Sequence, residues 1–147
     1  MSDRTVSVTR TIDAPQQAIF DVLADFRMHP VIDGSGTVSG GLSGPDRLRK
    51  GARFGMRMRI GLPYAIRNTV VEFEEGRLIA WRHFHGHRWR YQLRSVEGGT
   101  EVTETFDWSG ALFPRGIELM GYPRKHPEGM ARTLERLEQV VTSDQAT

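Results

Sequence analysis

Polar and apolar side chains alternate through the second half of the chain, and this pattern predicts β-strands. Between Leu78 and Trp108, arginines alternate with a set of large apolar residues that includes Trp81, Trp89 and Tyr91. A period of two places successive side chains on opposite faces of a sheet. We therefore expect one wet, charged face and one apolar face that another segment must cover.

A later segment has the period of a helix. Residues 126–141 place Met130, Leu134, Leu137 and Val141 along one side, with most of the charged residues on the other. Such an amphipathic stripe can cover the apolar face of the sheet. The two patterns together predict a curved sheet that grips a C-terminal helix, a shape that often leaves a ligand-sized hollow between them.

The remaining segments complete an α+β fold. Strands are expected over residues 4–12, 52–60, 65–73, 78–84, 88–96 and 100–108, with a further short strand inside the glycine-rich region 34–51. Two short helices follow the first strand, Leu62-Pro63 breaks another strand, and Pro127 opens the long helix. Sequential hairpins make the sheet of about seven strands antiparallel. The 147 residues are expected to form a single domain, 1–147.

The inward-facing side chains of this fold are the candidates for binding an apolar ligand. From the sheet they are Met56, Met58, Trp81, Trp89, Phe106 and Trp108, and from the helical side Met120, Met130 and Leu134. Thioethers adapt to varied ligands, and indoles supply large apolar surfaces. Ordinary filling of the core is the alternative explanation for each of them.

Three inward groups could carry catalysis. Glu104 shares a face with Val102 and Phe106, where loss of hydration would raise its pKa. His83 and Tyr91 are the imidazole and the phenol that strand order could bring close to it. Together they could move protons in a cyclisation, a dehydration or a hydrolysis. The alternative is that Glu104 is solvated at an open end of the sheet and that His83 hydrogen-bonds locally.

Charge is distributed unevenly along the chain. Residues 47–94 contain twelve Lys or Arg against three Glu, a balance of +9, so the flanks carry −7 of the net +2. One interpretation pairs these arginines across the outer face with Glu101 and Asp107. The other makes them a patch for nucleic acid or a phospholipid surface. A nucleic-acid platform needs aromatics beside the cations, whereas Trp89 and Tyr91 alternate with Arg88 and Arg90, so we expect no nucleic-acid partner.

Composition excludes several kinds of site. The chain has no cysteine, which excludes disulfides and thiolate metal ligands. His83, His85 and His87 have the spacing of a metal-binding strand, but a turn at Gly86 would point the rings apart, so we expect neither a metal nor a cofactor. No apolar stretch reaches the ~18 residues of a membrane span. We expect a cytoplasmic protein, and an oligomer is possible.

The order of elements resembles that of a known superfamily. The segments "IDAPQQAIFDVLADF" and "ARTLERLEQVV" resemble the helix-grip superfamily of START-type lipid-transfer domains, birch-pollen allergens and polyketide cyclases. "GRLIAWRHFHGHRWRYQL" followed by "GGTEVTETFDWS" is most similar to the bacterial polyketide cyclase/dehydrase-like branch of SRPBCC proteins. The resemblance implies an apolar or amphipathic ligand beneath the long helix. It transfers no catalytic residue, since the superfamily shares no short catalytic motif.

Three classes of function remain open. The first is a module that binds an apolar or polycyclic small molecule, such as a lipid or polyketide, between the sheet and the C-terminal helix. The second is a cyclase, dehydratase or hydrolase in the same hollow, in which Glu104, His83 and Tyr91 carry protons. The third is an interaction module that uses the basic face. The sequence favours the first.

Overall fold

The computed structural model describes residues 4–36, 38–82, 86–111, 114–119 and 122–145. Its strands are β1 (Thr5–Ile12), β2 (Val38–Ser43), β3 (Arg53–Ile60), β4 (Leu62–Glu74), β5 (Leu78–Arg82), β6 (Arg88–Val96) and β7 (Gly99–Asp107). Its helices are α1 (Gln16–Leu23), the 3-10 turn η1 (Phe26–Met28), α2 (His29–Ile32), α3 (Pro114–Leu119) and α4 (Tyr122–Gln145). The expected order of strand, short helices, strands and long helix is confirmed.

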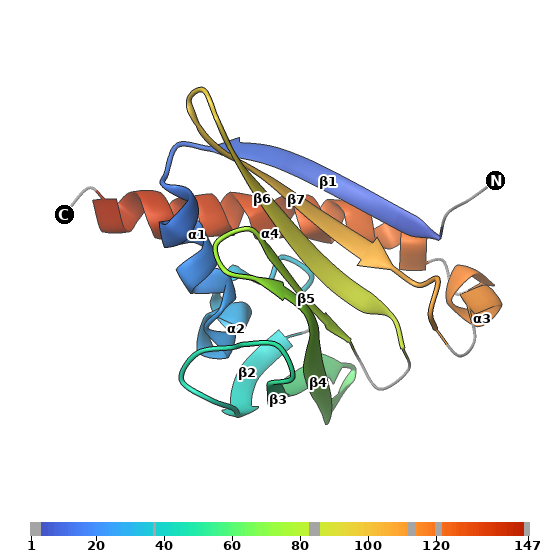
Figure 1. Cartoon of the computed structure of the whole chain (residues 1–147). Coiled ribbons are helices and arrows are strands. Elements are labelled where there is room, and N and C mark those ends of the chain that lie inside the picture. Colours follow the sequence, from blue (N-terminus) through green and yellow to red (C-terminus); the bar gives the residue numbers. More distant parts are fainter. Residues whose placement is uncertain (1–3, 37, 83–85, 112–113, 120–121, 146–147) are drawn as a thin grey trace.

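The strands form one antiparallel, seven-stranded sheet in the order β1-β7-β6-β5-β4-β3-β2. Figure 1 shows α4 running along the sheet, with α1 and α2 on the side where β2 lies. Helix α4 packs mainly against β1, and it also contacts β7 and the helices α1, α2 and α3. This is the helix-grip arrangement, in which the concave face of the sheet and α4 enclose the core.

Two cross-strand rows of side chains line the inner face. Val70, Trp81, Trp89, Phe106 and Val6 are paired in register across five strands, and Phe73, Ile79, Tyr91, Glu104 and Val8 form the neighbouring row. Most members of both rows are buried, whereas the arginines of β5 and β6 occupy alternate positions on the outer face. The period-two pattern therefore assigned the faces of these strands correctly.

A β-bulge in β4 changes which face its last residues occupy. The register shifts between Val70 and Glu72, so that Val70 and Phe73 both face inward although three positions separate them. The shift turns Glu72 to the outer face, beside the arginines of β6. The bulge matters for charge, because it supplies the outer face with a carboxylate that strict alternation would have placed inside.

Two predicted boundaries are wrong. Leu62-Pro63 does not break a strand: β4 begins at Leu62, directly after a tight turn in which Gly61 has a φ of +73°. Pro63 fits there because the strand is just beginning. Helix α4 begins at Tyr122, and Pro127 lies inside it rather than opening it. The proline forfeits one backbone hydrogen bond in the second turn, which this long helix tolerates.

The loop after α2 is fastened to α4 at the end of the core. Gly34 N donates to Thr133 Oγ1 (2.8 Å), and Arg132 Nε donates to the Gly34 carbonyl (2.9 Å). A Cβ at Gly34 would lie 2.5 Å from backbone atoms of Gly129 and Thr133, so only glycine permits this approach. The contact fixes Asp33, the residue before it, at the edge of the interior.

Across the described ranges, no helix combines the length and the apolar character that crossing a bilayer requires. Helix α4 is long enough, but its exposed side is charged.

Candidate functional site

Glu104 and Tyr91 lie side by side at the centre of the inner face. They are directly paired in register on β7 and β6, with Ile79 and Val8 beyond them in the same row. The Tyr91 hydroxyl lies close to the Glu104 carboxyl and influences its pKa as a hydrogen-bond donor. Two of the three side chains predicted to carry catalysis are therefore in contact, whereas His83 lies outside the described residues.

Glu104 is a buried acid in apolar surroundings. Its side chain is only 3 % exposed, so the alternative of a solvated carboxylate at an open end of the sheet is wrong. Burial raises its pKa well above the usual range, against the hydrogen bond from Tyr91, which lowers it. Its Oε1 atom accepts no hydrogen bond from the described residues. A buried oxygen without a partner is costly, and in a binding site it marks a position for a ligand group.

The surroundings of the pair favour the protonated form of both groups. Burial raises the pKa of Tyr91, and the neighbouring Glu104 adds to the effect. The charge of Asp33 also raises the pKa of both groups. Asp33 is held in place because its carboxylate accepts hydrogen bonds from the backbone N–H groups of Ser35 and Val38. A protonated carboxyl beside a phenol can donate as well as accept hydrogen bonds.

His29 is a second buried titratable group in the same core. Its ring stacks on Trp81 with centroids 4.5 Å apart, and its Nε2 donates to the Leu23 carbonyl at 2.9 Å. Burial lowers the pKa of His29 to about 4, although that hydrogen bond raises it. Trp81 in turn lies 5.5 Å from Tyr91 between ring centroids. A neutral imidazole, an indole and a phenol thus form a continuous aromatic series leading to Glu104.

A second aromatic group occupies the neighbouring part of the interior, toward α3. Phe106 lies at its centre, with ring centroids 4.8 Å from Trp89, 4.5 Å from His126 and 5.5 Å from Trp108. Met130 of α4 packs in the same cluster. Burial lowers the pKa of His126 to about 4, so its ring is neutral near neutral pH. Glu104 lies between this cluster and the main core, because its inner-face neighbours Val102 and Phe106 belong to one cluster each.

The remaining predicted ligand-binding residues divide between these two regions. Met56, Met58, Trp81 and Leu134 belong to the main core, and Trp89, Phe106, Trp108 and Met130 belong to the second cluster. Met120 lies outside the described residues. Their burial agrees with the inward positions expected from the sequence, and their contact with a ligand stays a prediction.

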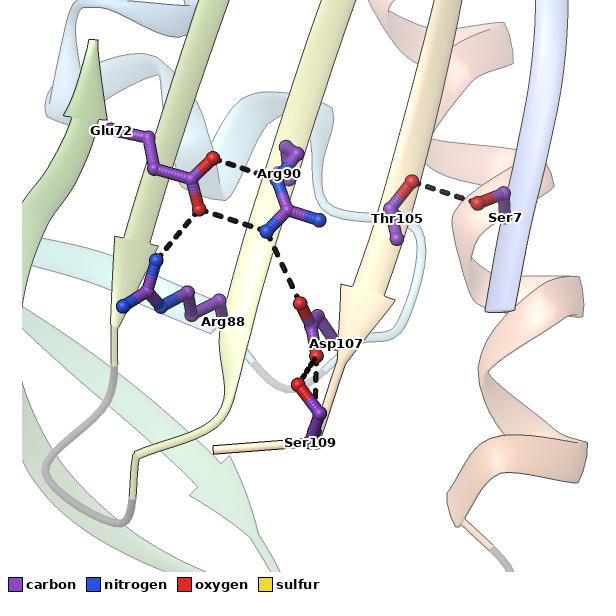
Figure 2. Close-up of polar contacts among 7 residues, drawn as sticks. All are labelled: Ser7, Glu72, Arg88, Arg90, Thr105, Asp107 and Ser109. Carbon is purple, nitrogen blue, oxygen red and sulfur yellow. Dashed lines mark hydrogen bonds and ion pairs between the residues drawn. The ribbon is translucent and has the colours of Figure 1, made fainter. Parts of the chain in front are cut away.

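The outer face of the same strands carries a network of ion pairs (Figure 2). Glu72 accepts hydrogen bonds from Arg88 (2.8 Å) and from Arg90 Nε (3.0 Å), and Arg90 also reaches Asp107 at 3.1 Å. Hydrogen bonds from Arg90 lower the pKa of Glu72 against its burial. For Asp107, burial raises the pKa, but hydrogen bonds from Ser109 and Arg90 outweigh it and the pKa is lowered. The expected pairing of these arginines with Asp107, and of Arg94 with Glu101, is confirmed.

Two hollows on the surface are lined by described residues, and neither lies beneath α4. One of about 520 Å³ lies where Asp13–Gln16 meets the β6–β7 hairpin, and one of about 460 Å³ lies over the outer ends of β4 to β7. Neither is lined by a residue predicted from the sequence. Among the described side chains, no three His, Asp or Glu gather as a metal site, and His83 and His85 are not among them.

Sequence reasoning missed His29, His126 and Asp33. His29 is the first residue of α2 and Asp33 directly follows this helix, which at four residues is too short to show a hydrophobic period. His29 precedes Pro30 inside an otherwise apolar run, "MHPVI", and this was the only available signal for a buried ring. His126 lies between lysine and proline near the start of α4, where polar neighbours suggest exposure.

The arrangement suits recognition of an apolar molecule with one polar group. Aromatic and thioether side chains provide the apolar surroundings, and Glu104 and Tyr91 provide one acid and one hydroxyl at the junction of the two clusters. An acid whose pKa is raised by burial can also deliver a proton to a bound molecule.

Comparison with known proteins gives the chain a family. The family described as "Polyketide cyclase / dehydrase and lipid transport" matches residues 3–142. The "Uncharacterized protein Rv0088" of Mycobacterium tuberculosis is 37% identical over 138 residues, which cover 88% of this chain and 62% of the relative. The chain thus spans less than two thirds of the length of the curated relatives that it matches.

Solved structures show the same fold at low identity. Protein NE0264 from Nitrosomonas europaea superposes with a TM-score of 0.78 at 15% identity and covers 100% of this chain and 99% of its own. Protein Ms6760 from Mycobacterium smegmatis superposes with a TM-score of 0.71 at 21% identity over 97% of this chain and 93% of its own. At such identities the likeness concerns the fold alone.

Proposed function

Because the chain belongs to the polyketide cyclase/dehydrase and lipid transport family, we propose that it binds an apolar small molecule, lipid-like or polyketide-like, between the sheet and α4. The observation that carries the proposal is Glu104, a buried acid whose Oε1 has no partner among the described residues. In a core built only for stability, an apolar side chain of similar size would avoid this cost. A ligand donor would satisfy the oxygen.

The proposed site has an apolar part and a polar part. Trp81, Trp89 and Phe106 provide aromatic surface, and Met56 and Met58 provide side chains that adapt to the shape of the ligand. The polar part consists of Glu104 and Tyr91, which fix one hydrogen-bonding group of the ligand. This division is common in small-molecule sites, where a few polar groups orient a mostly apolar ligand.

Binding of the fluorescent probe phenylnaphthylamine tests the proposal. The probe combines an apolar ring system with one N–H donor, and phenyl naphthyl ether is its counterpart without the donor. We expect the wild-type protein to prefer the amine and Glu104→Leu to lose that preference, a change of about tenfold for one hydrogen bond. Glu101→Leu is the matched control, because Glu101 lies on the outer face of the same strand, paired with Arg94.

Equal affinity of Glu104→Leu and wild-type protein for the amine would refute the role of the carboxyl. Failure of the wild-type protein to bind either probe, together with failure to bind a panel of lipids and polyketides, would refute the proposed function.

The raised pKa of Glu104 favours a second candidate function, proton transfer in a cyclisation, dehydration or hydrolysis within the same site. Glu104→Gln separates the two candidates because it keeps the size and the hydrogen-bonding capacity of the side chain but cannot release a proton. A binding module should retain its ligand with this substitution. An enzyme should retain binding and lose turnover.

A further inference from the structure

The outer face of β3, β4 and β5 carries a group of exposed arginines. Arg53, Arg57 and Arg59 alternate along β3, Arg67 follows on β4 and Arg82 on β5; all five are exposed. Within the part of the chain that the structure describes, none of these five forms an ion pair. We call these five residues the arginine patch.

The sequence and the register explain why the patch stays cationic. No Asp or Glu occurs between Arg47 and Val71. Arg67 pairs across the strands with Gly55, and Arg57 with Ala65, so only small uncharged side chains lie opposite them. Glu72, the next carboxylate along β4, is already bound by Arg88 and Arg90. Like charges gathered on one sheet face repel one another, and a partner that carries negative charge would relieve this.

Exposed apolar side chains adjoin the patch at the β3–β4 turn. Leu62 is 78 % exposed and Tyr64 is 42 % exposed, and Pro63 between them is also exposed. Arg59 pairs in register with Pro63, so a positive charge lies next to the apolar turn. Figure 1 shows β3 and β4 at the side of the molecule away from α4.

This combination points to one kind of partner. An anionic bilayer attracts clustered arginines through its phosphates and accepts leucine and tyrosine at the depth of the headgroups. Nucleic acid would need aromatic side chains on the arginine face, whereas Tyr64 occupies an inward position on β4, in line with Ile66 and Asn68. We propose that the β3–β4 hairpin docks the protein on an anionic phospholipid bilayer, with the exposed Leu62 at the turn entering the headgroup region and the arginine patch contacting the phosphates.

Flotation with lipid vesicles tests the docking. We expect binding to vesicles that contain phosphatidylglycerol, little binding to phosphatidylcholine alone, and release by added salt. Each basic residue near an anionic surface contributes a factor of about five, so the double variant Arg57→Gln/Arg67→Gln should bind about thirtyfold more weakly. Arg77→Gln/Arg94→Gln is the matched control, because it removes the same charge from exposed arginines already paired with Glu74 and Glu101.

A fluorophore at the turn tests insertion separately. The chain has no cysteine, so Leu62→Cys and Leu119→Cys can each be labelled at one position with nitrobenzoxadiazole. Leu119 is 88 % exposed on α3 and serves as the control, since it lies outside the hairpin. We expect the label at position 62 to brighten and shift to the blue on phosphatidylglycerol vesicles, and the label at position 119 to remain unchanged.

Three results would overturn the proposal: equal binding to both kinds of vesicle, equal loss of binding in the two double arginine variants, or binding of RNA or duplex DNA without binding of vesicles. Thermal unfolding of each variant verifies that it is folded. Docking on the bilayer requires no molecule in the interior. The result of this test is therefore independent of whether the protein binds a ligand there.

Discussion

Two of the acids on strand β7, Glu104 and Asp107, lie in surroundings that shift their pKa values in opposite directions. Glu104 faces the interior, where burial without a cation raises its pKa, while Asp107 faces outward, where Ser109 and Arg90 lower its pKa despite burial. His29 and Arg90 show the same contrast. Burial in the interior lowers the pKa of His29, so its ring is neutral near neutral pH, whereas the pKa of Arg90 on the outer face rises because its guanidinium donates hydrogen bonds to Glu72. The interior keeps its ionisable groups neutral and the outer face keeps them charged. A neutral acid among aromatic rings suits an apolar ligand, and charges suit water or a charged surface.

The largest expected effect concerns His29. Its pKa is about 4 in the folded protein and 6.5 in the unfolded chain, so the unfolded chain binds the proton first as the pH falls. The free energy of unfolding should therefore fall by about 3 kcal/mol between about pH 6.5 and pH 4 on account of His29. His29→Gln should remove this part of the dependence when urea unfolding is measured across the window, and His126, whose pKa is also lowered to about 4, should supply the part that remains. An unchanged pH dependence in the variant would mean that His29 is accessible to protons in the native state.

Glu104 should produce a pH dependence of the opposite sign. Its folded pKa lies above the unfolded value of 4.5. The cost of keeping its ionised form buried is therefore absent at lower pH and reduces stability progressively as the pH rises from there. Glu104→Gln should raise the free energy of unfolding by about 1–3 kcal/mol near pH 8 and leave it nearly unchanged near pH 4.

Between about pH 5 and pH 6.5 the two effects oppose each other. Stability should rise with pH in Glu104→Gln, where His29 and His126 titrate without the acid, and fall with pH in the double variant His29→Gln/His126→Gln, where the acid alone of these three groups titrates. Slopes of the same sign in the two variants would contradict the account of a neutral interior.

A smaller effect is expected on the outer face. Glu72→Gln leaves Arg88 and Arg90 without their shared carboxylate, so the free energy of unfolding should fall by about 1–2 kcal/mol. Glu74→Gln is the control on the same strand, because Glu74 makes an exposed ion pair with Arg77 and should contribute less than about 0.5 kcal/mol. Chemical denaturation of both variants measures the difference, and equal losses would show that the network in Figure 2 adds nothing beyond a surface pair.

The smallest effect should come from Arg94, whose pair with Glu101 is largely exposed. Arg94→Gln should change the free energy of unfolding by less than about 0.5 kcal/mol, and added salt should remove even that. A loss above about 1 kcal/mol would show that ion pairs at this edge of the sheet are stronger than their exposure suggests.

Several parts of this molecule follow from local pattern. Alternation assigned Glu104, Tyr91 and the tryptophans to the inner face. The assignment is well determined, since a shift of one residue would move every side chain of the strand to the opposite face. The position of Glu72 could not be derived this way, since the bulge that turns it outward depends on pairing with β5. His29 was missed because its burial arises from stacking on Trp81, which lies more than fifty positions away. The lack of partners in the arginine patch likewise depends on which residues face each other across the strands.

Native mass spectrometry with solvent extraction, applied to wild-type protein and Glu104→Leu purified side by side from a bacterial host, tests the central claim most directly. The account predicts a discrete apolar adduct on the wild-type protein and a depleted or absent adduct on the variant, although the variant should be the more stable of the two. A bare mass for the wild-type protein, or the same adduct in equal amount on both, would contradict the claim that Glu104 holds a ligand in the interior.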